Sequence, residues 1–304
     1  MVFKQLLPAA FGLVCATMAT PAHAATETMD PTSAWTVDYA DEKCSLLRDF
    51  GDVEKDGIGL RIDSYGSLVD FRVNVIGKKL PKARKPMSLT EVELPPDELP
   101  RTEVQALHGR IGNLNFIQFD LAFKASEPAK GRQRPSGDLA PEDTAEMAAP
   151  RTIDASFEAG VDSIKIAVQP GRSVDLRTGP IAPALAAIRT CVDDLRKSWG
   201  LDPEKQKSLT RRAHPIAASV ENVKKDFPEV LAALGRNAIV PLRVMVDAEG
   251  NGTGCTVQIS SAPEEFRKAA CTNIGTSFVP ALDKSGRPIP SFYQANVIYM
   301  SDRL

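Results

Sequence analysis

Alternating apolar and polar positions dominate the chain from about residue 35 to residue 169. The first clear run precedes the Ser64–Ser67 segment and the second follows it, and turn-forming residues separate them, which is typical of a β-hairpin. The alternating apolar residues are Ile58, Leu60 and Ile62, then Val69, Phe71, Val73 and Val75. Two further strands are predicted, from Leu114 to Phe123 and from Val161 to Val168, so this part of the chain is expected to be largely β.

A helical period replaces the alternation before residue 200. Apolar residues recur there at spacings of three and four, after Pro180 and up to Gly200, which predicts a helix that closes the β-rich domain. The residues of this stripe are Ile181, Leu185, Ile188, Val192, Leu195 and Trp199.

The pattern changes again from residue 226 onward, to strand, strand, helix, strand. Val240–Val246 and Cys255–Ile259 flank the turn residues Asp247–Gly252 and predict an antiparallel hairpin. A fourfold repeat from Phe266 to Phe278 predicts one helix that covers the hairpin, and Phe292–Met300 predicts a closing strand at the sheet edge.

Two segments lack either period. Residues 125–150 have the composition of a loop, interpreted as an insertion within the first domain; a linker between domains is the competing interpretation. Residues 201–213 are polar and form the main part of a connector. We therefore expect an α+β protein with a leader over 1–24, a β-rich domain over 25–200, a connector over 201–225 and a small β-β-α-β domain over 226–304.

The leader is expected from an apolar stretch, Leu6–Met18, that follows Lys4 and precedes Pro21–Ala25, the three-part pattern of a secretory signal peptide. We expect cleavage after Ala24 and a periplasmic protein without a stable membrane span. A retained membrane anchor is the alternative, and N-terminal sequencing of the exported protein distinguishes the two.

Composition excludes some functions. The 304 residues are 43% hydrophobic and 25% charged, which is typical of a folded chain, and the formal net charge of −2 gives no reason to expect a nucleic-acid partner.

Removal of the leader leaves four cysteines, an even number in an exported chain, where thiols oxidise to disulfides. Because Cys255 and Cys271 fall in the C-terminal unit and Cys44 and Cys191 in the first domain, we predict these two pairings. Zinc is the alternative, but the chain has no CxxC spacing, so neither a metal nor another cofactor is expected.

Signals of catalysis are weak. Gly250–Gly254 lies between two strands, so it is interpreted as a turn rather than a phosphate loop. Asp193 and Asp194 are helical neighbours, expected to face solvent. His108 and His214 lack an accompanying nucleophile motif and are interpreted as surface-loop histidines, so the chain is not expected to be an enzyme.

A set of short motifs in fixed order carries a family resemblance. They are Phe227-Pro228, Val246–Gly250, Cys255-Thr-Val, Ser260-Ser261, Cys271, Phe278–Ala281, Ser285–Pro288 and the closing strand. Together they resemble the C-terminal domain of TonB-family energy transducers. The resemblance implies a domain that binds periplasmic segments of outer-membrane transporters by adding their strand to its own edge. The chain departs from the family in lacking a Pro-rich spacer, which argues against energy transduction.

The partner-binding residues expected from this resemblance lie on the closing strand. They are Phe292, Tyr293, Gln294, Ala295, Asn296, Val297, Ile298, Tyr299 and Met300. The expected partner is a protein or peptide of the cell envelope, such as a TonB-dependent transporter, and a proline at Ala295 is expected to remove a donor needed for its binding. The alternative is a hydrolase or ligand-binding N-terminal domain that docks through the C-terminal module; a deep polar pocket within residues 35–199 would favour it.

Overall fold

The computed structural model describes residues 25–82, 85–95, 102–124, 147–216, 230, 238–258 and 262–299. Its elements are mostly strands with few helices, consistent with the predicted α+β class. The expected leader, most of the expected loop at 125–150, the end of the expected connector and Met300 lie outside the described residues.

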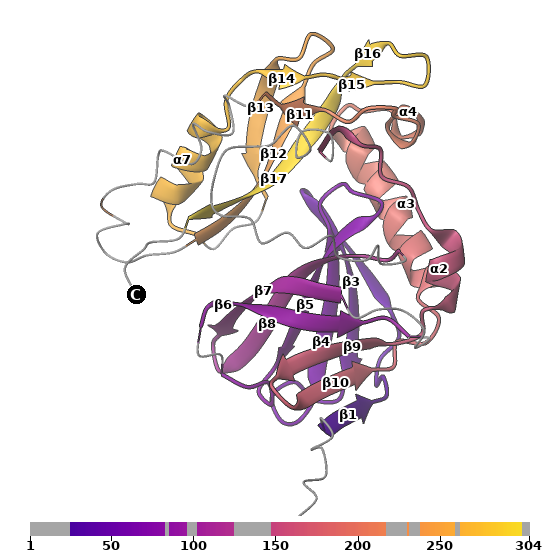
Figure 1. Cartoon of the computed structure of the whole chain (residues 1–304), viewed down its shortest axis with the longest axis vertical. Coiled ribbons are helices and arrows are strands. Elements are labelled where there is room, and N and C mark those ends of the chain that lie inside the picture. Colours follow the sequence, from indigo (N-terminus) through magenta and orange to yellow (C-terminus); the bar gives the residue numbers. More distant parts are fainter. Residues whose placement is uncertain are drawn as a thin grey trace, which may run out of the picture.

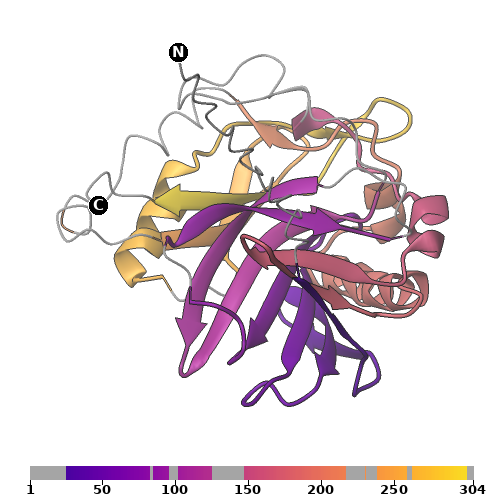
Figure 2. The ribbon, with the colours of Figure 1, turned by 60° about the horizontal axis from the view of Figure 1, so that its bottom comes forward.

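A ten-stranded sheet forms the N-terminal part (Figure 1, indigo to rose). Its strand order is β1-β10-β9-β6-β7-β8-β5-β4-β3-β2, with antiparallel neighbours except for the parallel pair β1 and β10. Figure 2 shows the strands side by side in a strongly curved sheet. The strands are β1 (Ala25–Met29), β2 (Thr36–Ala40), β3 (Lys43–Phe50), β4 (Ile58–Ser64), β5 (Asp70–Gly77), β6 (Met87–Glu93), β7 (Thr102–Ile111), β8 (Leu114–Ala122), β9 (Ile164–Gln169) and β10 (Arg172–Leu176).

The predicted hairpin is present as β4 and β5, and the predicted strand from Leu114 is β8. The strand expected from Val161 starts only at Ile164, because Val161 is the C-cap of the short helix α2 (Ala155–Gly160). Alternation explains the core, since the residues of β4, β5 and β8 that point to one face are buried together.

Helix α3 (Ala182–Ser198) packs against this core, as its apolar period predicts. Leu185, Ile188 and Val192 are fully buried, and Trp199 packs against the same cluster. Cys191 on α3 is joined to Cys44 on β3, with the two Cα atoms 6.0 Å apart. The disulfide therefore ties the closing helix to a strand near the start of the described chain, which is the predicted pairing.

The C-terminal part contains a three-stranded antiparallel sheet in the order β13-β12-β17. Its strands are β12 (Ala238–Val246), β13 (Gly252–Val257) and β17 (Ser291–Tyr299). Helix α7 (Glu264–Asn273) covers one face through Phe266 and Ala270, which are fully buried. Cys255 on β13 is joined to Cys271 on α7, the second predicted disulfide.

The helix predicted up to Phe278 is shorter than its apolar repeat. It ends at Asn273 because Gly275 has φ of +79°, a conformation that glycine adopts readily and that stops a helix. Phe278 belongs instead to β14 (Phe278–Val279), and its side chain still enters the same hydrophobic cluster. The repeat therefore identified the buried residues correctly and the helix end wrongly.

The segment after α3 is ordered in its described part. Helix α4 (Pro203–Lys207) begins at Asp202, whose carboxylate accepts the backbone N–H groups of Glu204 and Lys205. Strand β11 (His214–Pro215) then pairs with β14, and β15 (Ala281–Leu282) pairs with β16 (Pro288–Ile289). The N-terminal and C-terminal parts have separate hydrophobic clusters, while the domain boundaries themselves stay a prediction.

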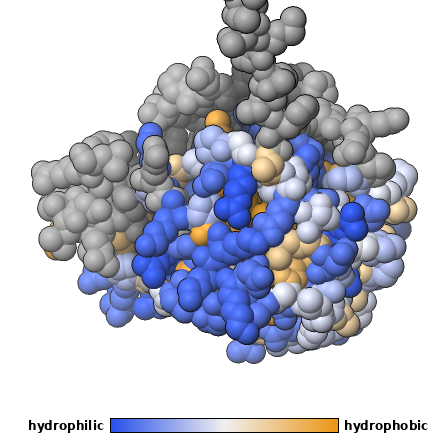
Figure 3. Space-filling model, turned by 90° about the horizontal axis from the view of Figure 1, so that it is seen from below, coloured by the Kyte–Doolittle hydropathy of each residue, from blue (hydrophilic) through white to orange (hydrophobic). Residues whose placement is uncertain are grey.

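The surface at the end formed by the ten-stranded sheet is mainly hydrophilic, with small separate apolar patches (Figure 3). Within the same residues, no helix combines the length and the apolar character that membrane crossing requires.

Candidate functional site

The expected partner-binding strand is β17, and its odd-numbered residues from Tyr293 to Tyr299 face the C-terminal hydrophobic cluster that includes residues of α7. Val297 and Tyr299 are buried there, and Tyr293 and Ala295 are partly buried in the same cluster. The Tyr299 ring stacks on Phe266 with centroids 4.8 Å apart. These residues anchor the strand, so they are not available to a partner.

The side chains of Phe292, Gln294 and Asn296 contact the N-terminal part, which the sequence did not predict. The Phe292 ring lies edge-on to Trp199, with centroids 5.3 Å apart. Gln294 donates from Nε2 to the backbone carbonyl of Tyr65, and Asn296 donates to Asp120 over 3.1 Å. The described side chains on both faces of β17 therefore have contacts within the chain, and its main-chain edge is the part of the strand that these contacts leave uncovered.

The neighbouring strands show which edge of β17 has no ladder partner among the described strands. Sheet order places β17 at the margin, with β12 as its only ladder partner in the described chain. The backbone carbonyl of Pro241 in β12 accepts from Gln258 N over 2.8 Å, on the β13 side. Because the N–H and C=O of one strand residue point to the same edge, the next residue, Leu242, directs its groups toward β17.

The register between β12 and β17 then determines which main-chain groups of β17 point toward β12. Leu242 lies opposite Ala295 and Val244 opposite Tyr293, so Ala295 and Tyr293 exchange hydrogen bonds with β12. The main-chain groups of Phe292, Gln294 and Asn296 point to the other edge. This corrects the expectation for Ala295: a proline there would break the internal ladder, whereas the donors directed outward belong to the even-numbered residues.

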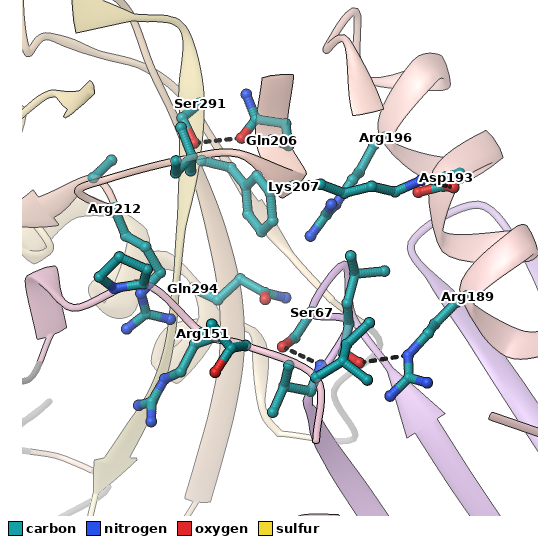
Figure 4. Close-up of a pocket in the computed structure, with 18 of the residues that line it drawn as sticks. Ser67, Arg151, Arg189, Asp193, Arg196, Gln206, Lys207, Arg212, Ser291 and Gln294 are labelled. Atoms are coloured by element: carbon teal, nitrogen blue, oxygen red, sulfur yellow. Dashed lines mark hydrogen bonds and ion pairs between the residues drawn. The ribbon is translucent and has the colours of Figure 1, made fainter. Parts of the chain in front are cut away.

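A cavity of about 570 Å³ adjoins the start of this edge. Ser291, Phe292 and Gln294 of β17 line one side and residues of α3 line another (Figure 4). Its charged lining is mostly basic. The charged residues are Arg151, Arg189, Asp193, Arg196, Lys207 and Arg212. The cavity thus joins a strand edge that has no ladder partner among the described strands to a cluster of cations from elements far apart in the sequence.

Arg196 is the most buried of these cations, with 6% of its surface exposed. Its Nε and Nη2 atoms donate to the carbonyl of Gly66 over 3.0 and 2.7 Å, and its guanidinium lies over the Phe292 ring. Burial lowers the pKa of Arg196 to about 10, so the side chain remains protonated at neutral pH.

The other cations have carboxylate or carbonyl partners. Arg189 forms two hydrogen bonds with Glu158, of 2.6 and 2.8 Å, and Lys207 contacts Asp193 over 2.6 Å. Arg212 donates to the carbonyl of Met147 over 2.8 Å. The prediction that Asp193 faces solvent is therefore wrong, because α4 places Lys207 against it; Asp194 on the next helix position is exposed.

Both histidines lie in strands, so their interpretation as surface-loop residues is also wrong. His108 on β7 is partly buried, which lowers its pKa, and its Nε2 lies 2.8 Å from Ser88 Oγ. His214 on β11 is 4% exposed, and its Nδ1 contacts the carbonyl of Arg212. Neither ring lines the cavity described above.

A second polar cluster is structural. The Asp63 carboxylate is fully buried in the ten-stranded sheet and accepts from Ser45 over 2.6 Å, from Asn74 over 3.0 Å and from Lys43 over 3.2 Å. A buried charge with this many donors is satisfied in place, so it needs no ligand. Within the described residues no group of His, Cys, Asp and Glu side chains is arranged to hold a metal ion.

Sequence reasoning missed the cavity because its basic residues come from segments without a common motif. One signal was available: Arg243 and Met245 on β12, with Phe292 on β17, form a large and partly apolar outer sheet face. A solvated sheet face is normally polar, so this face already indicated a covering layer.

Comparison with known proteins agrees with the C-terminal fold. Residues 223–300 match the family described as the Gram-negative bacterial TonB protein C-terminal, which confirms the resemblance found in the motifs. No curated protein and no solved structure matches the chain significantly.

Proposed function

We propose that this chain is a TonB-like protein of the cell envelope that binds a protein partner by strand addition to β17 and acts in envelope transport. The match of residues 223–300 supports the class of protein. The observation that carries the proposal is the position of β17, which has a ladder partner on one side and directs the main-chain groups of Phe292, Gln294 and Asn296 to the other.

Strand addition suits this geometry because main-chain hydrogen bonds supply the affinity. An extended partner segment would pair with the three even-numbered residues, while the side chains of β17 stay in their present contacts. The binding surface then needs no rearrangement of the hydrophobic clusters on either side of the sheet. We expect the partner to be the periplasmic segment of an outer-membrane transporter.

Proline scanning tests the edge with a matched control. Gln294→Pro removes a donor on the open edge, whereas Gln294→Ala removes the same side-chain contact with Tyr65 and keeps the N–H. With a photo-crosslinker at the exposed residue Asn296 and an envelope extract, Gln294→Ala is expected to crosslink like the parent. Gln294→Pro is expected to lower the yield roughly tenfold, by loss of a hydrogen bond and of strand geometry.

Two outcomes count against the proposal. One is equal crosslinking by the proline and alanine variants. The other is a crosslinked segment, mapped by mass spectrometry, that belongs to no periplasmic part of a transporter. Ala295→Pro serves as a contrast, because it is expected to destabilise the fold through the ladder to β12 rather than to affect the partner alone.

Export remains part of the proposal. A periplasmic location requires that the apolar leader directs secretion, and N-terminal sequencing of the exported protein is expected to start at Ala25. A chain that keeps Met1 would instead favour an anchored protein. As for the alternative of a ligand-binding N-terminal domain, the cavity has lining residues from both parts, which favours joint action of the two parts over an N-terminal site of its own.

A further inference from the structure

We propose that the strand that adds to β17 places a carboxylate side chain, of Glu or Asp, in the cavity between β17 and α3, where Arg196 binds it. The inference rests on the proposed function and adds to it the chemistry by which the partner segment is selected.

Residues at the start of the outer edge of β17 line the cavity. Ser291, Phe292 and Gln294 line the cavity, and the main-chain groups of the latter two point away from β12. A strand that pairs with them therefore runs along one wall of the cavity. Figure 4 shows Arg196 extending from α3 toward the middle of the same space. Alternate side chains of the added strand project to opposite faces, so one of them is directed into the cavity.

The lining of the cavity carries more positive than negative charge. Five cationic side chains and one carboxylate, that of Asp193, line the cavity. Three cations have carboxylate partners: Arg189 with Glu158, Lys207 with Asp193, and Arg151 with Asp70 at 3.6 Å. These pairs neutralise part of the lining charge. Arg196 forms no such direct pair, although the Asp193 carboxylate is close enough to act on its charge.

The guanidinium of Arg196 has a buried hydrogen-bond donor that lacks an acceptor among the described residues. More than nine-tenths of this side chain is buried, and its only hydrogen-bond acceptor in the described chain is the carbonyl of Gly66. Its Nη1 atom is buried and has no hydrogen-bond partner among the described residues. The Asp193 carboxylate attracts the Arg196 charge without satisfying Nη1. A buried donor without an acceptor is costly, and a carboxylate is the group that satisfies a guanidinium best.

Synthetic peptides as long as β17, which has nine residues, provide the probe. Each peptide alternates valine and threonine and carries a single Glu, and the position of the Glu differs from one peptide to the next. For each of them, a control peptide carries Gln at the same position. Fluorescence anisotropy with the full chain measures binding. We expect one Glu position to bind roughly tenfold more tightly than its Gln match, because a charge-assisted hydrogen bond is gained there.

Variants locate the effect. Arg196→Met is expected to abolish the difference between the Glu and Gln peptides. Because Arg196 also holds the Gly66 carbonyl, Lys207→Met is a second variant: it is partly exposed, and it leaves the Asp193 carboxylate to repel the ligand, so the difference should shrink. Arg177→Met, on an exposed arginine that contacts Asp30 in the N-terminal part, is the control and should change nothing.

The outcomes separate the two proposals. If Glu and Gln peptides bind equally at every position, and Gln294→Pro still prevents binding, the carboxylate inference is overturned and strand addition stands. A Glu preference that survives both Arg196→Met and Lys207→Met also overturns it. If no peptide binds the parent chain, and Gln294→Pro has no effect on crosslinking, both proposals are overturned.

Discussion

The guanidinium of Arg243 on β12 binds both carboxylate oxygens of Glu42, a residue 201 positions earlier in the turn between β2 and β3. The Nη2 distances are 2.9 and 3.0 Å, and the guanidinium carbon lies 4.1 Å from the centre of the Trp199 ring. The pair therefore joins the outer face of the C-terminal sheet to the N-terminal part.

Loss of Glu42 should cost more than loss of Arg243. Glu42→Gln leaves the buried Arg243 charge without a counter-charge, and we expect it to lower the free energy of unfolding by about 3 kcal/mol. Arg243→Met should cost less, because Glu42 is more exposed and methionine still packs on Trp199. Urea unfolding of both variants and of the double variant gives the coupling energy. Additive effects would contradict the pairing. Arg177→Met, in an exposed ion pair, should change stability by less than about 1 kcal/mol.

The two disulfides should differ in their contribution. Cys44–Cys191 encloses a loop with a sequence separation of 147, and Cys255–Cys271 one of 16. By the chain-entropy model the longer loop stabilises by about 2 kcal/mol more. Denaturant unfolding of the two double-alanine variants measures the difference. A larger loss from the Cys255/Cys271 variant would show that loop closure does not determine the contribution here.

Gly66 should not tolerate alanine. Its φ is +109°, and an added Cβ would lie 2.7 Å from ring atoms of Trp199. We expect Gly66→Ala to lower stability by at least about 2 kcal/mol, through backbone strain and overpacking. Gly112→Ala is the control, since Gly112 has φ of +60° with no atom within 4 Å of the new Cβ. Equal thermal shifts for the two variants would show that the Trp199 contact contributes nothing.

Asp283 should make stability depend on pH in the acid range. A hydrogen bond from Ser285 Oγ, together with the backbone N–H of Arg287, lowers the pKa of Asp283 from 3.8 to about 2. Because the folded pKa lies below the unfolded one, the stabilisation is complete above the unfolded value and is lost as pH falls to the folded value. An NMR titration of the carboxyl carbon should show the low pKa, and Ser285→Ala should raise it. An unchanged pKa in Ser285→Ala would assign the shift to other groups.

Several helices and strands of this fold could be predicted from the sequence. The alternation around Ser64–Ser67 predicted β4 and β5, the three- and four-residue spacing from Ile181 predicted α3, and both disulfides followed from where the cysteines fall. The end of α7 was not readable, because Phe278 continues the apolar repeat although Gly275 has already stopped the helix.

The closing strand was predicted nearly as the structure has it, but the direction of its main-chain groups was not. The pattern placed a strand at Phe292–Met300, but Ala295 was taken as a donor for a partner. Only the register against β12, with the Pro241 carbonyl directed to β13, shows that Ala295 bonds internally and Gln294 points outward. Periodicity assigns side chains to faces of a sheet; it does not assign main-chain groups to edges.

By itself the sequence determined the class of the strongly periodic elements, the pairing of the cysteines and the family of residues 223–300, because these depend on period, spacing and motif order. The tertiary structure decided that the N-terminal part covers the second face of the C-terminal sheet, and that Arg196 lies beside the open edge of β17. These relationships join residues that are far apart in the sequence, such as Gln294 and Tyr65, which are 229 positions apart. Their contact depends on how whole layers pack, and no local sequence pattern specifies that packing.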